Sequence, residues 1–163
     1  SEQQVIMVPD RNLAGYVARF TTKEILPWDG FCLVHERFTR KDIQTARSRH
    51  PGAEVLVHPE CRPEVIDAAD QVFSTSGMIR HICGSKNEKF IIGTETGILH
   101  QISLKCPEKH CYPLSSRAIC VNMKKTDLEK VHAALDRMAP RVLVPERIAI
   151  PARRAIDRML ALP

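Results

Sequence analysis

The chain has 163 residues, 44% hydrophobic and 26% charged, a composition typical of a globular protein with one domain or two small ones. No apolar run approaches the roughly 20 residues that a membrane helix needs, so no membrane span is predicted, and the start lacks a signal-peptide pattern. The net charge of +5 is mixed with acidic residues at helical spacing and only 5% of residues are aromatic, so nucleic-acid binding is not predicted.

The first third of the chain alternates short apolar runs with helical patterns. Three strands are predicted there, at residues 4–8, 31–34 and 54–57. Asp10 is placed to cap the helix after the first strand. Thr39, with Asp42 three residues later, indicates the start of another helix. The chain begins almost directly on a strand pattern without an initiator methionine, so we expect that an N-terminal part of a longer protein is missing.

The same alternation continues to about Pro113. Pro63 opens a short helix, residues 74–77 (STSG) open the next, and a third runs from about Ile98 to Ile102. Two more strands are predicted, at residues 71–73 and 89–93. Repeated strand–helix alternation predicts a parallel sheet covered on both faces, so the expected fold class is α/β, three-layer αβα with small parallel sheets.

The last third of the chain has a helical pattern only. Thr126 and Glu129 form a capping-box pattern for a helix that ends near Met138. A final helix is predicted from Pro151 to Leu162.

Polar residues gather where the predicted strands end, which is the edge at which open α/β sheets bind ligands. They are His35, His58 with Glu60, Ser74 to Ser76, and Thr94 with Glu95. An imidazole and a carboxylate at one edge can share proton transfer, which favours His58 and Glu60 as a functional pair. His35 alone fits an ordinary strand end. The hydroxyl run fits a helix cap or an anion site, and Thr94 with Glu95 fits capping or chemistry.

The cysteines have irregular spacings and no CxxC pair: Cys32, Cys61, Cys83, Cys106, Cys111 and Cys120. Without a secretory signal, this pattern predicts reduced thiols in a cytoplasm, some of them used for a metal, instead of a disulfide framework. Cys120 lies just before a predicted capped helix, and thiolates near helix starts are better ligands.

Five motifs resemble quinolinate synthase, in the order VPDRNLAGYV, PWDGFCLVHERF, VHPECRPEVIDAAD, STSGMI and AICVNMKKTDLEKV. The resemblance covers essentially the whole chain and is to the C-terminal half of that family. It implies a pseudo-threefold arrangement of three αβα domains around a cavity, with about half of it present. Residues 1–33 would end the second domain, 34–118 form the third, and 119–163 pack on the missing first domain.

The resemblance also implies the chemistry. Quinolinate synthases condense iminoaspartate with dihydroxyacetone phosphate to quinolinate for NAD biosynthesis, and an L-aspartate oxidase or aspartate dehydrogenase would supply the iminoaspartate. The family uses a [4Fe–4S] cluster as a Lewis acid. Cys32 and Cys120 match two of its three cysteine ligands, and the third lies outside this chain. Cys61 is interpreted as a non-ligand.

The remaining matches give the expected catalytic and substrate-binding residues. Glu60 and His58 match a pair implied in proton transfer and substrate contact, and His35 matches a histidine beside the cluster. Ser74 and Thr75 match hydroxyls that hold a substrate carboxylate. The alternative from another class is an inactive α/β module that binds an anion or zinc.

Overall fold

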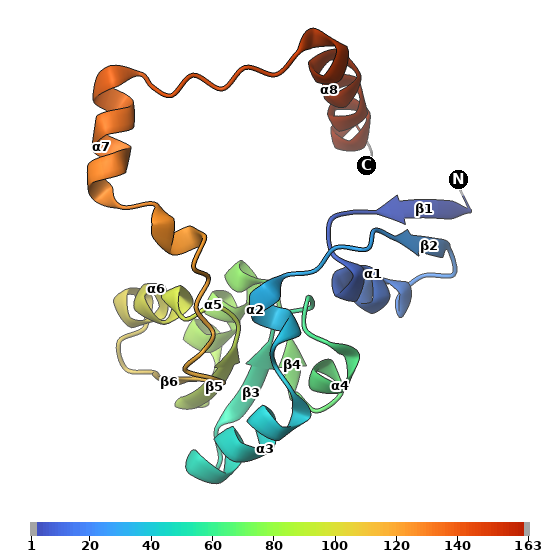
Figure 1. The fold of residues 1–163 in the computed structure, drawn as a ribbon. Helices are drawn as coiled ribbons and strands as arrows, with labels where there is room; N and C mark the ends of the chain where they lie inside the picture. Colours follow the sequence, from blue (N-terminus) through green and yellow to red (C-terminus); the bar gives the residue numbers. More distant parts are fainter. Residues whose placement is uncertain (1–2, 162–163) are drawn as a thin grey trace. The chain divides into compact units, whose positions relative to one another are not determined.

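The computed structural model describes residues 3–161, which fall into two compact units. The first unit extends to Val121 and the second begins at Asn122. All strands of the described residues belong to the first unit, where they form two parallel sheets (Figure 1).

The smaller sheet has two parallel strands joined by a helix. β1 (Gln4–Met7) pairs with β2 (Glu24–Pro27), and α1 (Arg11–Ala18) connects them. Asp10 caps α1 as predicted, because its side chain accepts hydrogen bonds from the first free N–H groups of the helix.

The strand predicted at residues 31–34 is wrong. Residues 33 and 34 begin α2 (Leu33–Glu36), and β2 is the strand that pairs with β1. The Asp10 side chain accepts a hydrogen bond from the backbone N–H of Cys32, so this N–H cannot pair with a neighbouring strand. A short apolar run does not by itself distinguish a strand from one helical turn.

The larger sheet has four parallel strands in the order β4-β3-β5-β6. Its elements are α3 (Arg40–Arg49), β3 (Glu54–Val57), α4 (Pro63–Ile66), β4 (Gln71–Val72), α5 (Thr75–Gly84), β5 (Lys89–Gly93), α6 (Gly97–Lys105) and β6 (His110–Pro113). The predicted strands that correspond to β3, β4 and β5 are confirmed. The edge strand β6, which was not predicted, pairs with β5.

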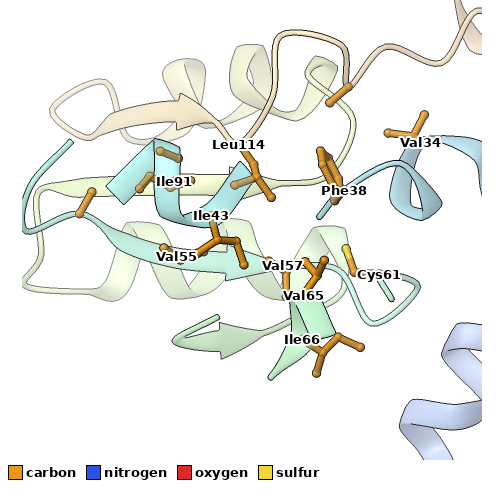
Figure 2. Packing of buried hydrophobic residues seen from close by; sticks show 13 residues of the cluster. Val34, Phe38, Ile43, Val55, Val57, Cys61, Val65, Ile66, Ile91 and Leu114 are labelled. Carbon is orange, nitrogen blue, oxygen red and sulfur yellow. The ribbon is translucent and has the colours of Figure 1, made fainter. Parts of the chain in front are cut away.

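Both faces of the larger sheet are covered by helices. Side chains alternate along β3, so Val55 and Val57 face one cluster of buried residues and Leu56 faces another. Figure 2 shows the first cluster, in which β3 and β5 pack against residues of α2, α3 and α4, including Val34, Ile43, Val65 and Ile66. The second cluster joins the sheet to α5 and α6 through Met78, Ile82, Ile98 and Ile102. The predicted three-layer α/β class is therefore confirmed.

The second unit contains α7 (Leu128–Arg137) and α8 (Glu146–Leu160), and neither helix has a buried residue. Apolar side chains on both are exposed, among them Leu128, Val131, Leu135, Ile148, Ile156 and Met159. Across residues 3–161, no helix is long and apolar enough to cross a membrane.

Two predicted helix starts in this unit are wrong. The cap of α7 is Asp127, which accepts the N–H of Lys130, and not Thr126. Asp at the N-cap accepts this bond as well as Thr does, so the pattern leaves the register open by one residue. α8 begins before Pro151 and includes it, and the predicted end at Leu162 lies outside the described residues.

Candidate active site

The candidate site lies where β3 and β5 of the larger sheet end. His58 and Glu60 follow β3, Thr94 follows β5, and α2 brings His35 to the same place. His35 was expected at the end of a strand, but it lies on a helix. The strand-end prediction is therefore wrong for its element, although His35 does reach the same edge of the sheet.

His35 is the centre of a short hydrogen-bonded chain. Its side chain is buried, with Nδ1 2.9 Å from Oε2 of Glu60 and Nε2 2.8 Å from Oγ1 of Thr94. Both ring nitrogens therefore have a partner, and the orientation of the ring is set from two sides.

His58 lies against this chain. Its ring stacks on the ring of His35, with centroids 4.5 Å apart and planes inclined by 8°. The backbone N–H of Glu60 donates to Nδ1 of His58 over 3.3 Å. Burial, together with the charge that His35 can carry, lowers the pKa of His58 from its ordinary value of 6.5. The ring of His58 is therefore held largely neutral near pH 7.

The carboxylate of Glu60 remains charged in the same place. The hydrogen bond from His35 lowers the pKa of Glu60 from its ordinary value of 4.5, although partial burial acts in the opposite direction. An ionised carboxylate and a neutral imidazole thus lie side by side, which is an arrangement suited to moving a proton.

Cys32 joins this group at the start of α2. Its thiol, a ring nitrogen of His35 and a carboxylate oxygen of Glu60 all lie within 4.8 Å of one another. Asp10, which is 2% exposed, fixes the Cys32 loop. One of its oxygens accepts the N–H of Cys32 over 2.8 Å, and the other caps α1 through the N–H groups of Asn12 and Leu13.

Cys120 is held in a similar way. Its N–H donates to Oε1 of Glu95 over 3.3 Å, and Oε2 of Glu95 accepts the N–H of Gly97 over 2.7 Å at the start of α6. The backbone N–H of each of the two cysteines thus donates to a carboxylate, and that carboxylate also accepts an N–H group in the first turn of a helix. Cys32 and Cys120 are both partly buried and pack against the same core cluster.

Cys61 differs from both. It is fully buried, and its thiol donates to the carbonyl of Gly93 over 3.6 Å. Burial raises the pKa of Cys61 to about 12, so its thiolate is strongly disfavoured near pH 7. This protonation state supports the interpretation of Cys61 as a non-ligand.

Ser74 and Thr75 begin α5. Ser74 is the N-cap and accepts the N–H of Gly77 over 3.3 Å. Among residues 3–161, no hydrogen bond connects Ser74 or Thr75 with His35, His58 or Glu60. The structure therefore brings together Cys32, His35, His58 and Glu60, while Ser74 and Thr75 are exposed residues at the start of α5.

Two contributors to the site were missed in the sequence. Asp10 was predicted only as a helix cap, and its second role at Cys32 has no local signal. Asn12 was not identified at all, yet its Nδ2 donates to the carbonyl of Glu60 over 3.1 Å. The motif VPDRN contains both residues, two positions apart, and is the only signal in the sequence that could have indicated them.

The expectation of reduced thiols throughout is also corrected. Cys83 near the end of α5 and Cys106 at the end of α6 form a disulfide, with Cα atoms 5.5 Å apart. The spacing of 23 residues along the chain gave no indication of it, because packing of the two helices brings the pair together.

Similarity to known proteins decides the family. Residues 1–161 match the family model described as quinolinate synthetase A protein. The chain belongs to the quinolinate synthetase A family.

Relatives of this family are similar over nearly the whole chain. Quinolinate synthase of Methanoregula boonei is 61% identical over 162 residues, which are 99% of this chain and 54% of the relative. Quinolinate synthase of Desulforudis audaxviator is 48% identical over 99% of this chain and 53% of the relative. Quinolinate synthase 1 of Methanosarcina acetivorans is 46% identical over 98% of this chain and 52% of the relative. The chain thus spans about half the length of the curated relatives that it matches.

Proposed function

We propose that this chain provides one half of a quinolinate synthase, which condenses iminoaspartate with dihydroxyacetone phosphate. The observation that carries the proposal is the group of Cys32, His35 and Glu60, whose ligand atoms lie within 4.8 Å of one another in a member of this family. An L-aspartate oxidase or aspartate dehydrogenase would supply the iminoaspartate.

The residues present fit a [4Fe–4S] cluster. Cys32 and Cys120 are free, partly exposed thiols, and a carboxylate fixes the backbone N–H of each. Thiolates are the usual ligands of such clusters, and these two would hold it together with a cysteine outside this chain. When bound, the cluster supplies an iron with an open position that acts as a Lewis acid. Thiolate ligands must be reduced cysteines, and Cys32 and Cys120 are both free although Cys83 and Cys106 form a disulfide.

The protein side chains supply proton transfer and orientation. Glu60 is ionised and takes a proton from substrate carbon. His58, held neutral beside it, orients substrate or relays the proton that Glu60 has taken to a leaving hydroxyl, which departs as water. His35 orients the Glu60 carboxylate through the hydrogen bond between its Nδ1 and Oε2 of Glu60. Ser74 and Thr75, at the first turn of α5, bind a substrate carboxylate once the other half of the enzyme is in place.

The exposed apolar stripes of α7 and α8 support the proposed domain division. Neither helix buries a residue within the described chain, and the relatives are almost twice as long. We propose that residues 119–163 pack on the first domain, that residues 1–33 complete the second, and that 34–118 form the third. Burial of these stripes would supply a favourable free energy of roughly 25 cal/mol per Å² of apolar surface.

Glu60→Gln in the complete protein tests the proposed activity. After anaerobic reconstitution, wild type should contain about four irons and four sulfides per chain and should form quinolinate. The variant should keep its iron while the rate of quinolinate formation falls by about 100-fold or more, because the proton acceptor is lost. Glu64→Gln on α4 changes a carboxylate that is 41% exposed and should behave as wild type. A normal rate for Glu60→Gln contradicts the assignment.

The same three ligand atoms also favour a second candidate, a module that binds one zinc ion. Cys, His and carboxylate are all zinc ligands, and His35 would have to release one of its present partners. Metal analysis distinguishes the two. Stoichiometric zinc that Cys32→Ser removes, with no iron or sulfide retained by the complete protein, favours the zinc module over the enzyme.

A further inference from the structure

Thr94 has no role in the function proposed above, yet it is the buried end of the hydrogen-bonded chain at the site. It follows β5 directly and is 5% exposed. Its hydroxyl contacts Nε2 of His35 over 2.8 Å, and Nδ1 of the same ring contacts Glu60 over 2.9 Å. We propose that Thr94 is a positioning residue that fixes the orientation of His35 and, through His35, the carboxylate of Glu60. The catalytic consequence rests on the proposed function, whereas the positioning itself does not.

The direction of each hydrogen bond follows from the chemistry of the partners. An ionised carboxylate only accepts, so Nδ1 of His35 carries the proton that Glu60 binds. In a neutral imidazole, the other nitrogen is then an acceptor, and the Thr94 hydroxyl donates to Nε2. The carboxylate of Glu60 thus selects the ring form with the proton on Nδ1, and the Thr94 hydroxyl, by donating to Nε2, holds that ring in one orientation.

The consequence for Glu60 is a carboxylate with one bound and one open oxygen. Oε2 receives the hydrogen bond from His35, and Asn12 holds the carbonyl of the same residue. Within residues 3–161 no hydrogen bond reaches Oε1, and the side chain is 22% exposed. The open oxygen is thus presented in one orientation to a ligand, which is the preorganisation that proton transfer requires.

A purely structural role for Thr94 makes a different prediction. Thr94→Val keeps the shape of the side chain and removes the hydroxyl, whereas Thr94→Ser keeps the hydroxyl and removes a methyl group. If Thr94 only fills space, the Ser variant is the more damaged one. If it positions His35, the Val variant is the more damaged one and the Ser variant is close to wild type.

The tautomer of His35 can be measured in the 163-residue chain itself, with no substrate or cluster. Two-bond ¹H–¹⁵N correlation spectra of histidine-labelled protein show which ring nitrogen carries the proton, and His35→Gln identifies the signal. We expect the proton on Nδ1 in wild type and in both variants, because the carboxylate of Glu60 still accepts it. The ¹⁵N resonance of the unprotonated Nε2 should be the same in wild type and Thr94→Ser and should shift in Thr94→Val, which has no donor for it. A wild-type ring protonated on Nε2, or a Val spectrum identical to wild type, overturns the proposal. If the Val variant does not fold, a folded Thr94→Ser whose Nε2 resonance differs from wild type still overturns the proposal, because Ser keeps the donor.

Kinetics of the complete protein then test the catalytic consequence. In Thr94→Val, kcat should fall by about 10- to 100-fold, the usual cost of losing an outer partner of a site residue, and KM should change less. Thr94→Ser should restore kcat. An active wild type whose kcat is unchanged in Thr94→Val overturns the catalytic part. An inactive wild type with the expected spectra of wild type, Thr94→Val and Thr94→Ser contradicts the proposed function and leaves the positioning role supported.

Discussion

Asp10→Asn is the substitution that best tests how the Cys32 loop is held. The wild-type carboxylate accepts three backbone N–H groups, those of Asn12 and Leu13 through one oxygen and that of Cys32 through the other. An amide has one oxygen and one NH₂ group. No orientation of Asn at this position can therefore accept all three N–H groups, and one N–H always faces a donor.

The size of the effect follows from burial of the site. Asp10 is 2% exposed, so the N–H that loses its acceptor is not rehydrated, and Asp10→Asn should lower the free energy of unfolding by about 1–3 kcal/mol. Asp10→Ala also removes the cap of α1, which adds about 1 kcal/mol. The Ala variant should therefore be the less stable of the two.

Urea unfolding of the 163-residue chain, followed by circular dichroism, measures both variants. Asp42→Asn is the matched control in the same unit, because one Asp42 oxygen serves the N–H and hydroxyl of Thr39 and the amide oxygen can replace it. This control should stay within about 0.5 kcal/mol of wild type. An Asp10→Asn variant as stable as the control would refute the reasoning that one buried carboxylate serves both the helix and the cysteine loop.

Three further predictions concern the acid stability of the protein and its thiols. Burial lowers the pKa of His58 below 6.5, so the unfolded state binds a proton at this residue before the folded state does as the pH falls. The free energy of unfolding should therefore decrease as the pH is lowered below about 6.5, and His58→Gln should flatten that part of the pH profile. The hydrogen bond from His35 lowers the pKa of Glu60 below 4.5. The stability that Glu60 contributes is therefore fully present above about pH 4.5 and is lost as the pH falls through the lower pKa of the folded state. Glu60→Gln should remove this acid-induced loss of stability. Midpoints of urea unfolding between about pH 3 and 8 measure both effects, and a variant whose pH profile equals that of wild type would contradict the prediction for that residue. Air-oxidised, denatured chain should contain four reactive thiols before reduction and six after it, and six at both stages would contradict the Cys83–Cys106 disulfide.

The sequence by itself predicted the elements that depend on neighbours along the chain. The apolar runs of β3 and β5 are buried on both faces and gave strands at the expected residues. Asp10, Thr39 and Ser74 cap helices as predicted, because a cap needs only a side-chain oxygen two or three residues before the N–H that it accepts. The motifs around these elements were sufficient to indicate the family.

The tertiary structure decided which of these pieces meet. His35 lies 25 residues from Glu60 and 59 from Thr94, and only the folding of α2 over the ends of β3 and β5 makes them one chain of hydrogen bonds. The same holds for Asp10 and Cys32, and for the disulfide between α5 and α6. Periodicity and capping report the local backbone, whereas these contacts depend on the strand order β4-β3-β5-β6, in which strands distant in the sequence are neighbours in space.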